Sequence, residues 1–190
     1  MRLALIGSRE APRRVLSLMT TIGQRLSEEG HFSYSGGAPG SDEAWLAKYD
    51  RSNSCRIIPY SGFCGHVPGT GVVVWSELSN EAKIKSIIKA REVTSYWDEC
   101  SKIVQTLFAR NSMQVLGLEC TEPVDKVLYW APEKRCGSVS GGTRVAVDIA
   151  RRHGIECVNL YDKKVFKSLE EEYSPKFDIF SFFIVFLSVC

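Results

Sequence analysis

The stretch "HFSYSGGAPGSDEAW" at residues 31–45 decides the fold, because it passes from a strand through a glycine-rich turn into a helix. The apolar and aromatic residues before Gly36 are typical of a short buried strand. The apolar residues after the turn have helical spacing and indicate a helix from about residue 41 to residue 50. Glycine and proline between two such segments mark a turn. The stretch therefore predicts a strand–turn–helix unit.

Similar units lie on both sides of this stretch. "LALIG" at residues 3–7 predicts a strand, and the helix that follows is bounded by Pro12 in its first turn and Gly30 just past its end. "CRIIPY" at residues 55–60 predicts a third strand. This β-α-β-α-β order favours an α/β fold with a single doubly wound, mostly parallel sheet flanked by helices. Such a sheet binds ligands at the carboxyl ends of its strands.

The alternation continues to residue 162, so we expect residues 1–162 to form one domain. The pattern predicts three further strands, at residues 71–75 (or a buried edge), 125–132 and 155–161. It predicts a helical region over residues 80–116 that breaks near Thr94 or Ser95, and a helix from about residue 144 that is closed by Gly154. Loops are expected at residues 61–71 and 133–143.

Residues 163–190 form a predicted C-terminal extension that ends in the apolar tail "FDIFSFFIVFLSVC" at residues 177–190. The tail is too short for a membrane helix, which needs about 20 apolar residues, so no membrane association is predicted. We expect it to pack on the domain or to make a contact in a homo-oligomer, because a free apolar tail promotes aggregation.

Composition narrows the function classes. Hydrophobic residues make up 44% of the 190 residues and the net charge is +2, which suits one soluble domain and argues against general nucleic-acid binding. The seven cysteines form no C-x-x-C pair and the three histidines lie far apart, so neither a metal site nor a cofactor is predicted. The N-terminus has no signal-peptide pattern, and reduced thiols in a cytoplasmic protein are expected.

Three glycine-rich loops follow predicted strands, at residues 7–12, 35–42 and 138–143. In a parallel sheet these loops lie at the same edge, where glycine lets the backbone approach a ligand. A helix that begins after each loop turns free N–H groups and its positive dipole end toward an anion. Neither the dinucleotide fingerprint nor the P-loop pattern is present, which argues against a standard dehydrogenase or NTPase. The loops therefore predict a site for a nucleotide-type ligand.

The loop residues have specific candidate roles. Arg9 offers a planar fork to a phosphate. Asp42 either accepts from a ribose hydroxyl or caps its own helix, and Thr143 is either a phosphate ligand or a helix cap. The loop residues predicted to bind the ligand are Gly7, Ser8, Arg9, Ser35, Gly36, Gly37, Gly40, Asp42, Gly141, Gly142 and Thr143. Trp97, Tyr129 and Trp130 are candidates for stacking on a base, although aromatic residues at such spacing are more often part of the core.

Several motifs together indicate a family. "ALIGSRE", "SGGAPGSDEAW" and "SGGTRVAVDIARRHGIECVNL" resemble the Rossmann-like nucleotide-binding superfamily that joins the DNA-processing protein A (DNA recombination-mediator) family with the Lonely Guy phosphoribohydrolases. The segments "ARNSMQVLG" at 109–117 and "VLYWAP" at 127–132 resemble a phage-encoded branch of it. The resemblance covers about residues 1–162 and implies a Rossmann-like fold with a nucleotide near the glycine loops. It also implies that Arg110 and Asn111 reach a phosphate and a base, the alternative being a capping and surface role.

Three functions remain open from the sequence. The first is binding of a nucleotide or nucleotide-derived ligand without turnover, as in sequestration of a signalling nucleotide. The second is a nucleoside-phosphate N-glycosidase, with Glu43 and Asp42 as candidate catalytic carboxylates near the ribose. The third is a single-stranded DNA or recombination accessory protein. The later loop, "SGGTRVAV", lacks the G-x-G-T spacing and the glutamate of the Lonely Guy motif, which favours binding over cleavage.

Overall fold

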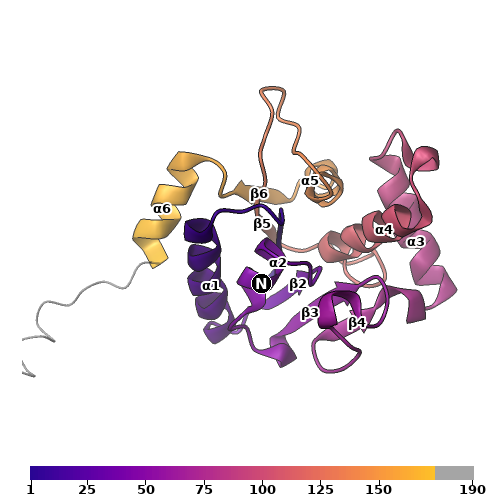
Figure 1. The fold of residues 1–190 in the computed structure, drawn as a ribbon, viewed down its shortest axis with the longest axis horizontal. Helices are drawn as coiled ribbons and strands as arrows, with labels where there is room; N and C mark the ends of the chain where they lie inside the picture. The colour runs from indigo at the N-terminus through magenta and orange to yellow at the C-terminus, as the bar shows by residue number, and fades with distance from the viewer. Residues whose placement is uncertain (174–190) are drawn as a thin grey trace, which may run out of the picture.

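Six parallel strands form one sheet in the order β4-β3-β2-β1-β5-β6 in the computed structural model, which describes residues 1–173 (Figure 1). The strands are β1 (Arg2–Gly7), β2 (Phe32–Ser35), β3 (Ser54–Ile58), β4 (Val72–Val74), β5 (Lys126–Trp130) and β6 (Glu156–Asn159). Every pair of neighbouring strands is parallel. The prediction of a single α/β sheet flanked by helices is confirmed.

The helices lie in two layers, one on each face of the sheet (Figure 1). They are α1 (Arg13–Glu28), α2 (Ser41–Leu46), α3 (Asn80–Glu92), α4 (Lys102–Leu116), α5 (Thr143–Arg152) and α6 (Lys163–Tyr173). Alternate residues of each strand point to opposite faces. Leu3 and Leu5 of β1 therefore pack with α1, α2 and α6, while Ala4 and Ile6 pack with α3, α4 and α5.

The order of the strands reverses between β1 and β5. From β1 the chain proceeds outward through β2, β3 and β4, then returns across the sheet to place β5 on the other side of β1. The loops after β1 and β5 lead to helices on opposite faces, since α1 belongs to one layer and α5 to the other. A crevice therefore opens at the carboxyl ends of these two strands, as expected at a topological switch point.

Two predicted helices differ in length from the structure. The helix expected over residues 41–50 ends at Leu46. The chain then turns so that the Tyr49 hydroxyl donates to the His31 carbonyl at 2.8 Å, and Asp50 accepts from the Ser52 N–H at 2.8 Å at the start of a 3₁₀ turn. The expected break in the region 80–116 is wider than one residue, because residues 93–101 separate α3 from α4.

The predicted C-terminal extension begins as α6. Phe166, Leu169 and Tyr173 pack against the cluster formed by α1 and the sheet. The apolar tail at 177–190 lies outside the described residues, and the homo-oligomer contact expected from it stays a prediction. No helix within residues 1–173 is long and apolar enough to cross a membrane.

Trp97, Tyr129 and Trp130 are buried. Trp97 and Tyr129 belong to the core that includes α3, α4 and α5, and Trp130 belongs to the core on the opposite face. None of the three lines the cavity described below. These positions fit the alternative that the three residues belong to the core and do not stack on a base.

Candidate functional site

A cavity of about 440 Å³ lies at the carboxyl ends of β1 and β5, where the strand order reverses. Four segments line it: residues 6–10 at the end of β1, Ala38 and Asp42 at the start of α2, one face of α4, and residues 140–143 at the start of α5. The volume falls in the range of small-molecule sites, roughly 300–1,000 Å³. The fold thus brings the three glycine-rich loop regions and the 109–117 segment together at one edge.

The start of α5 presents free backbone donors to the cavity. The amides of Gly141, Gly142 and Thr143 donate to no protein group within residues 1–173, and no side chain caps the helix. The Asn111 side-chain amide donates to the Gly142 carbonyl at 3.0 Å, which holds this turn against α4. Unpaired N–H groups and the positive end of the helix dipole together favour an anion at this point.

Arg110 is the most unusual residue of the site. Only 5% of its surface is exposed, and its Nε has no hydrogen-bond partner within the described residues. Its Nη1 lies 3.4 Å from the Ile57 carbonyl and 4.0 Å from Asp42 Oδ2, and the guanidinium stands 5.7 Å from the centre of the Phe63 ring. Burial lowers the pKa of Arg110, Asp42 opposes this change, and nearby Arg9 adds to it.

Gln114 and Gly36 lie beside the guanidinium of Arg110. With its amide oxygen turned toward Arg110, Gln114 accepts from Arg110 Nη1 at 2.5 Å and from the Gly36 N–H at 3.1 Å. A Cβ at Gly36 would lie 1.6 Å from Arg110 Nη1, so a side chain at this position would force the guanidinium to shift. Gly36 was predicted to give a ligand access to the backbone, but here it makes room for Arg110.

Asp42 is the buried carboxylate of the cavity. Its side chain accepts from the Ala38 N–H at 3.3 Å and is 5% exposed as a residue. Burial raises the pKa of Asp42 to about 6, although Arg110 and the backbone N–H groups of Ala38 and Gly7 act in the opposite direction. The carboxyl group therefore changes charge close to neutral pH, where it borders the cavity and faces Arg110.

Glu43 lies outside the cavity, although it is next to Asp42 in the sequence. Its Oε1 lies 2.8 Å from His66 Nε2 and 3.7 Å from Arg56 Nε. Successive residues of a helix point about 100° apart, and this turn directs Glu43 toward His66 and Arg56 while Asp42 borders the cavity. The structure does not bring Glu43 together with the other predicted site residues.

The remaining predicted residues divide into two groups. Those that line the cavity are Gly7, Ser8, Arg9, Asp42, Arg110, Asn111, Gly141, Gly142 and Thr143. Ser35, Gly36, Gly37 and Gly40 do not line it. The Ser35 hydroxyl donates to the Leu5 carbonyl at 2.6 Å and so joins β2 to β1. A Cβ at Gly40 would lie 2.7 Å from Arg9 Cα, so Gly40 supports the loop after β1 from behind.

The sequence interpretation missed the side chains that α4 contributes besides Arg110 and Asn111. Val104, Leu107 and Phe108 form an apolar wall, and Gln114 continues the same face. Their spacing relative to Asn111 is the i, i+3, i+4, i+7 pattern of one helix face, which would have located them once Asn111 was placed in the site. Glu10, which directly follows Arg9, also lines the cavity and was not predicted.

Comparison of the chain with protein-family models, curated proteins and solved structures found no match. The resemblance to the DNA-processing protein A and Lonely Guy superfamily therefore stays a prediction. The function has to be argued from the geometry of the cavity. Within residues 1–173, no group of three or more His, Cys, Asp or Glu side chains is arranged to hold a metal ion.

Proposed function

We propose that the protein binds a nucleotide or nucleotide-derived ligand in the cavity between β1 and β5, and holds it without turnover. The observation that carries the proposal is the buried, incompletely paired guanidinium of Arg110 on the cavity wall. Leaving a buried donor without a partner costs about 1–3 kcal/mol. A phosphate oxygen that accepts from Arg110 removes this cost.

The anionic group of the ligand has donors from two directions. Arg110 approaches from α4, and the unpaired amides of residues 141–143 approach from the start of α5. Arg9 adds a second guanidinium from the loop after β1, close enough to lower the pKa of Arg110. Guanidinium groups bind phosphate in bidentate geometry, and helix starts bind it through N–H groups.

The base and sugar have a separate surface. Val104, Leu107 and Phe108 give the cavity an apolar wall on the α4 side. A flat aromatic base is stabilised by contact with such side chains, and Asn111 and Gln114 on the same face supply polar groups. A ligand with one apolar ring and one anionic group fits both parts of the cavity, and nucleotides have this combination.

Binding is tested by thermal unfolding with a panel of nucleoside mono- and triphosphates, the matching nucleosides and inorganic phosphate. We expect at least one nucleotide to raise Tm, and its nucleoside and phosphate alone to raise it much less. A ligand at 100 times its Kd stabilises the fold by about 2.7 kcal/mol. If no nucleotide in the panel shifts Tm, the proposal fails.

Matched variants locate the site. Arg9→Gln removes an exposed cation, and the double variant Asp42→Asn/Arg110→Met removes both buried charges together, so that neither is left uncompensated. We expect each to abolish or strongly reduce the Tm shift. Arg56→Met is the control, because Arg56 is also buried and its Nε forms no hydrogen bond within residues 1–173, but it does not line the cavity.

A second candidate function is cleavage of the N-glycosidic bond of the ligand, and one observation favours it. The Asp42 carboxyl borders the cavity and its pKa is raised to about 6 by burial, which suits a proton donor or acceptor near neutral pH. Chromatography of a bound nucleoside monophosphate tests it. Release of free base that stops in Asp42→Asn supports cleavage, and an intact nucleotide after prolonged incubation supports holding.

A further inference from the structure

Basic residues stand at the starts of α1 and α6, where the helix dipole disfavours them. α1 begins with Arg13 and Arg14, and α6 begins with Lys163 and Lys164, while neither helix has an acidic residue in its first turn. α6 instead carries its acidic residues, 170–172, in its last turn. Acidic residues at the start of a helix and basic residues at its end are each favourable by about 0.3–1 kcal/mol. Local helix stability therefore does not explain these basic residues.

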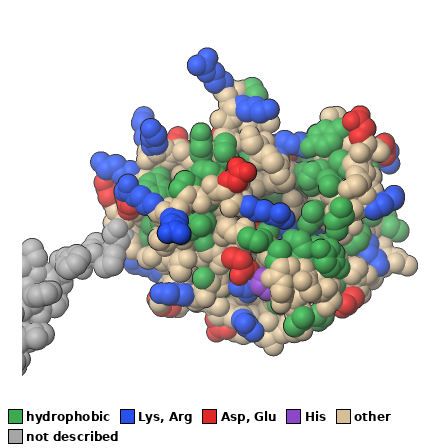
Figure 2. Space-filling model, in the orientation of Figure 1, with side chains coloured by type: hydrophobic (Ala, Val, Ile, Leu, Met, Phe, Trp, Pro, Cys, Tyr) green, Lys and Arg blue, Asp and Glu red, His purple; other side chains and the backbone are tan. Residues whose placement is uncertain are grey.

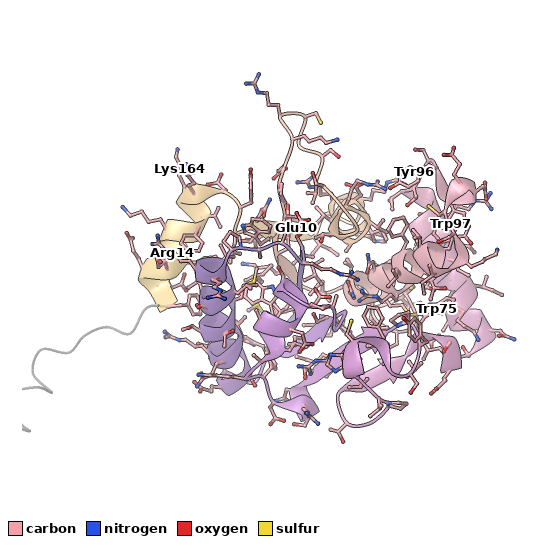
Figure 3. The ribbon with its side chains drawn as sticks, in the orientation of Figure 1. Glu10, Arg14, Trp75, Tyr96, Trp97 and Lys164 are labelled. Atoms are coloured by element: carbon pink, nitrogen blue, oxygen red, sulfur yellow. The ribbon has the colours of Figure 1, made fainter. Side chains whose placement is uncertain are left out.

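The start of α1 lies beside α6, between the first and last turns of α6. Arg14 Nη2 is 2.7 Å from Glu170 Oε2, and the guanidinium of Arg14 stands 5.2 Å from the centre of the Phe166 ring. Lys163 precedes Phe166 by one turn and Glu170 by two, so it lies on the face of α6 that is turned toward the start of α1. In Figure 3, Lys164 lies at the upper end of α6, and Arg14 lies at the upper end of α1, beside α6.

A third basic segment stands at the same edge of the sheet. The loop from β5 to α5 projects from the molecule (Figure 1) and is closed by the antiparallel bridge between Glu133 and Val139. Lys134 and Arg135 are exposed on it. Figure 2 shows Lys and Arg side chains, in blue, on the projecting loop and, as a separate group, on the side of the molecule where α1 and α6 lie.

An exposed aromatic residue lies among these basic segments. Tyr161, which follows β6, is 46% exposed, and its ring packs edge-to-face on Trp130 with centroids 5.6 Å apart. The Trp130 carbonyl accepts from the Ser8 N–H at 2.8 Å, and Ser8 lines the cavity. Tyr161 is therefore linked to the proposed nucleotide site through one residue, Trp130.

The basic residues of this edge lack matching acids. We call them the basic rim: those that form no ion pair within residues 1–173 are Arg9, Arg13, Lys134, Arg135, Lys163 and Lys164. The acids nearby are Glu10, Glu133 and Asp162. Glu133 pairs with Arg151, and Asp162 Oδ1 accepts from the Lys164 N–H at 2.7 Å as the cap of α6. Cations therefore outnumber free carboxylates on the rim.

We infer that the basic rim binds additional phosphate groups of the same ligand, so that the ligand is a nucleotide with several phosphates rather than a simple monophosphate. This inference rests on the proposed function. One nucleotide unit occupies the cavity, and the remaining phosphates extend past Ser8 and Tyr161 toward the starts of α1 and α6. A small, highly charged ligand fits better than a long nucleic acid, because the net charge of the whole chain is only +2.

The experiment compares a nucleoside triphosphate with the monophosphate of the same base, by calorimetric titration at low salt. The variant is Lys163→Glu/Lys164→Glu, and the control is Lys167→Glu, one turn further along α6. We expect the wild type to bind the triphosphate at least tenfold more tightly. The double variant should lose about tenfold in triphosphate affinity while its monophosphate affinity changes less than twofold. The control should bind both like the wild type.

A stability measurement separates a ligand role from a structural one. Acidic residues at positions 163 and 164 suit the start of α6, so Tm of the ligand-free double variant should stay the same or rise. The inference is overturned if the monophosphate binds as tightly as the triphosphate, or if the double variant weakens both ligands equally. It is also overturned if a single-stranded oligonucleotide binds more tightly than the triphosphate. If neither nucleotide binds at all, the proposed function itself has failed.

Discussion

Arg110 and Arg56 are both buried arginines whose Nε forms no hydrogen bond within residues 1–173, yet only Arg110 lines the cavity between β1 and β5. Arg56 Nη2 donates to the Leu46 carbonyl at 3.0 Å, and its carboxylate partner, Glu43, is half-exposed. The carboxylate nearest to Arg110 is Asp42, which is itself buried and 4.0 Å away. The comparison shows that a buried charged side chain without a full set of hydrogen-bond partners indicates a ligand site only where a cavity adjoins it.

The largest expected effect is that of Arg110→Met, which leaves the Asp42 carboxylate buried without its cation. Breaking a buried ion pair from one side costs about 3–5 kcal/mol. We expect a loss of this size in the free energy of unfolding at pH 8, measured by urea denaturation, and a smaller loss at pH 5, where Asp42 takes up a proton. Asp42→Asn/Arg110→Met should recover most of it; equal losses in the single and double variants would show that the two side chains are not coupled.

The pH dependence of stability should come next in size. Because the folded pKa of Asp42 is raised from 3.8 to about 6, the folded state binds more protons than the unfolded state between these two values. The free energy of unfolding should therefore fall by roughly 3 kcal/mol as pH rises from about 4 to about 6. Below and above this range, the contribution of Asp42 should not change with pH. Urea denaturation across this range, compared with Asp42→Asn, isolates the contribution of Asp42. An unchanged slope in the variant would contradict the assignment.

Gly36→Ala tests the space beside Arg110. The new Cβ would overlap Arg110 Nη1, so we expect a loss of about 1–3 kcal/mol in stability and weaker nucleotide binding. Gly142→Ala is the matched control, because its Cβ meets only Phe108 at 3.9 Å and its φ is −66°. The control should stay within about 0.5 kcal/mol of the wild type. Chemical denaturation of both variants checks the difference.

The smallest effect is expected for Arg56→Met, the other member of the comparison. It removes the hydrogen bond to the Leu46 carbonyl and a contact with a half-exposed carboxylate, which together stabilise the fold by about 1 kcal/mol. Nucleotide affinity should not change. A variant that folds but no longer binds nucleotide would move the candidate site from Arg110 to the surface around Glu43 and His66.

Much of the sheet was predictable, because the sequence patterns that mark its strands are local. Short apolar runs, glycine-rich turns and helical spacing each span only a few residues, and they located β1, β2, β3, β4, β5 and β6 to within a few residues. The alternation of strands and helices then predicted a parallel sheet with its loops at one edge. The end of α2 was missed because it depends on Tyr49 reaching the His31 carbonyl, a contact between segments far apart in the chain.

The sequence by itself determined that Gly7, Ser8 and Arg9 and residues 141–143 meet at the edge of one sheet, because parallel strands necessarily bring their following loops together. Only the tertiary structure decided that Asp42 faces the cavity while Glu43 turns to His66 and Arg56. It also decided that Gly36 leaves room for Arg110, because the guanidinium, which comes from α4, occupies the space that a Cβ at position 36 would need. The physical reason is that hydrophobic spacing acts within a segment, whereas burial and charge pairing depend on which segments pack together.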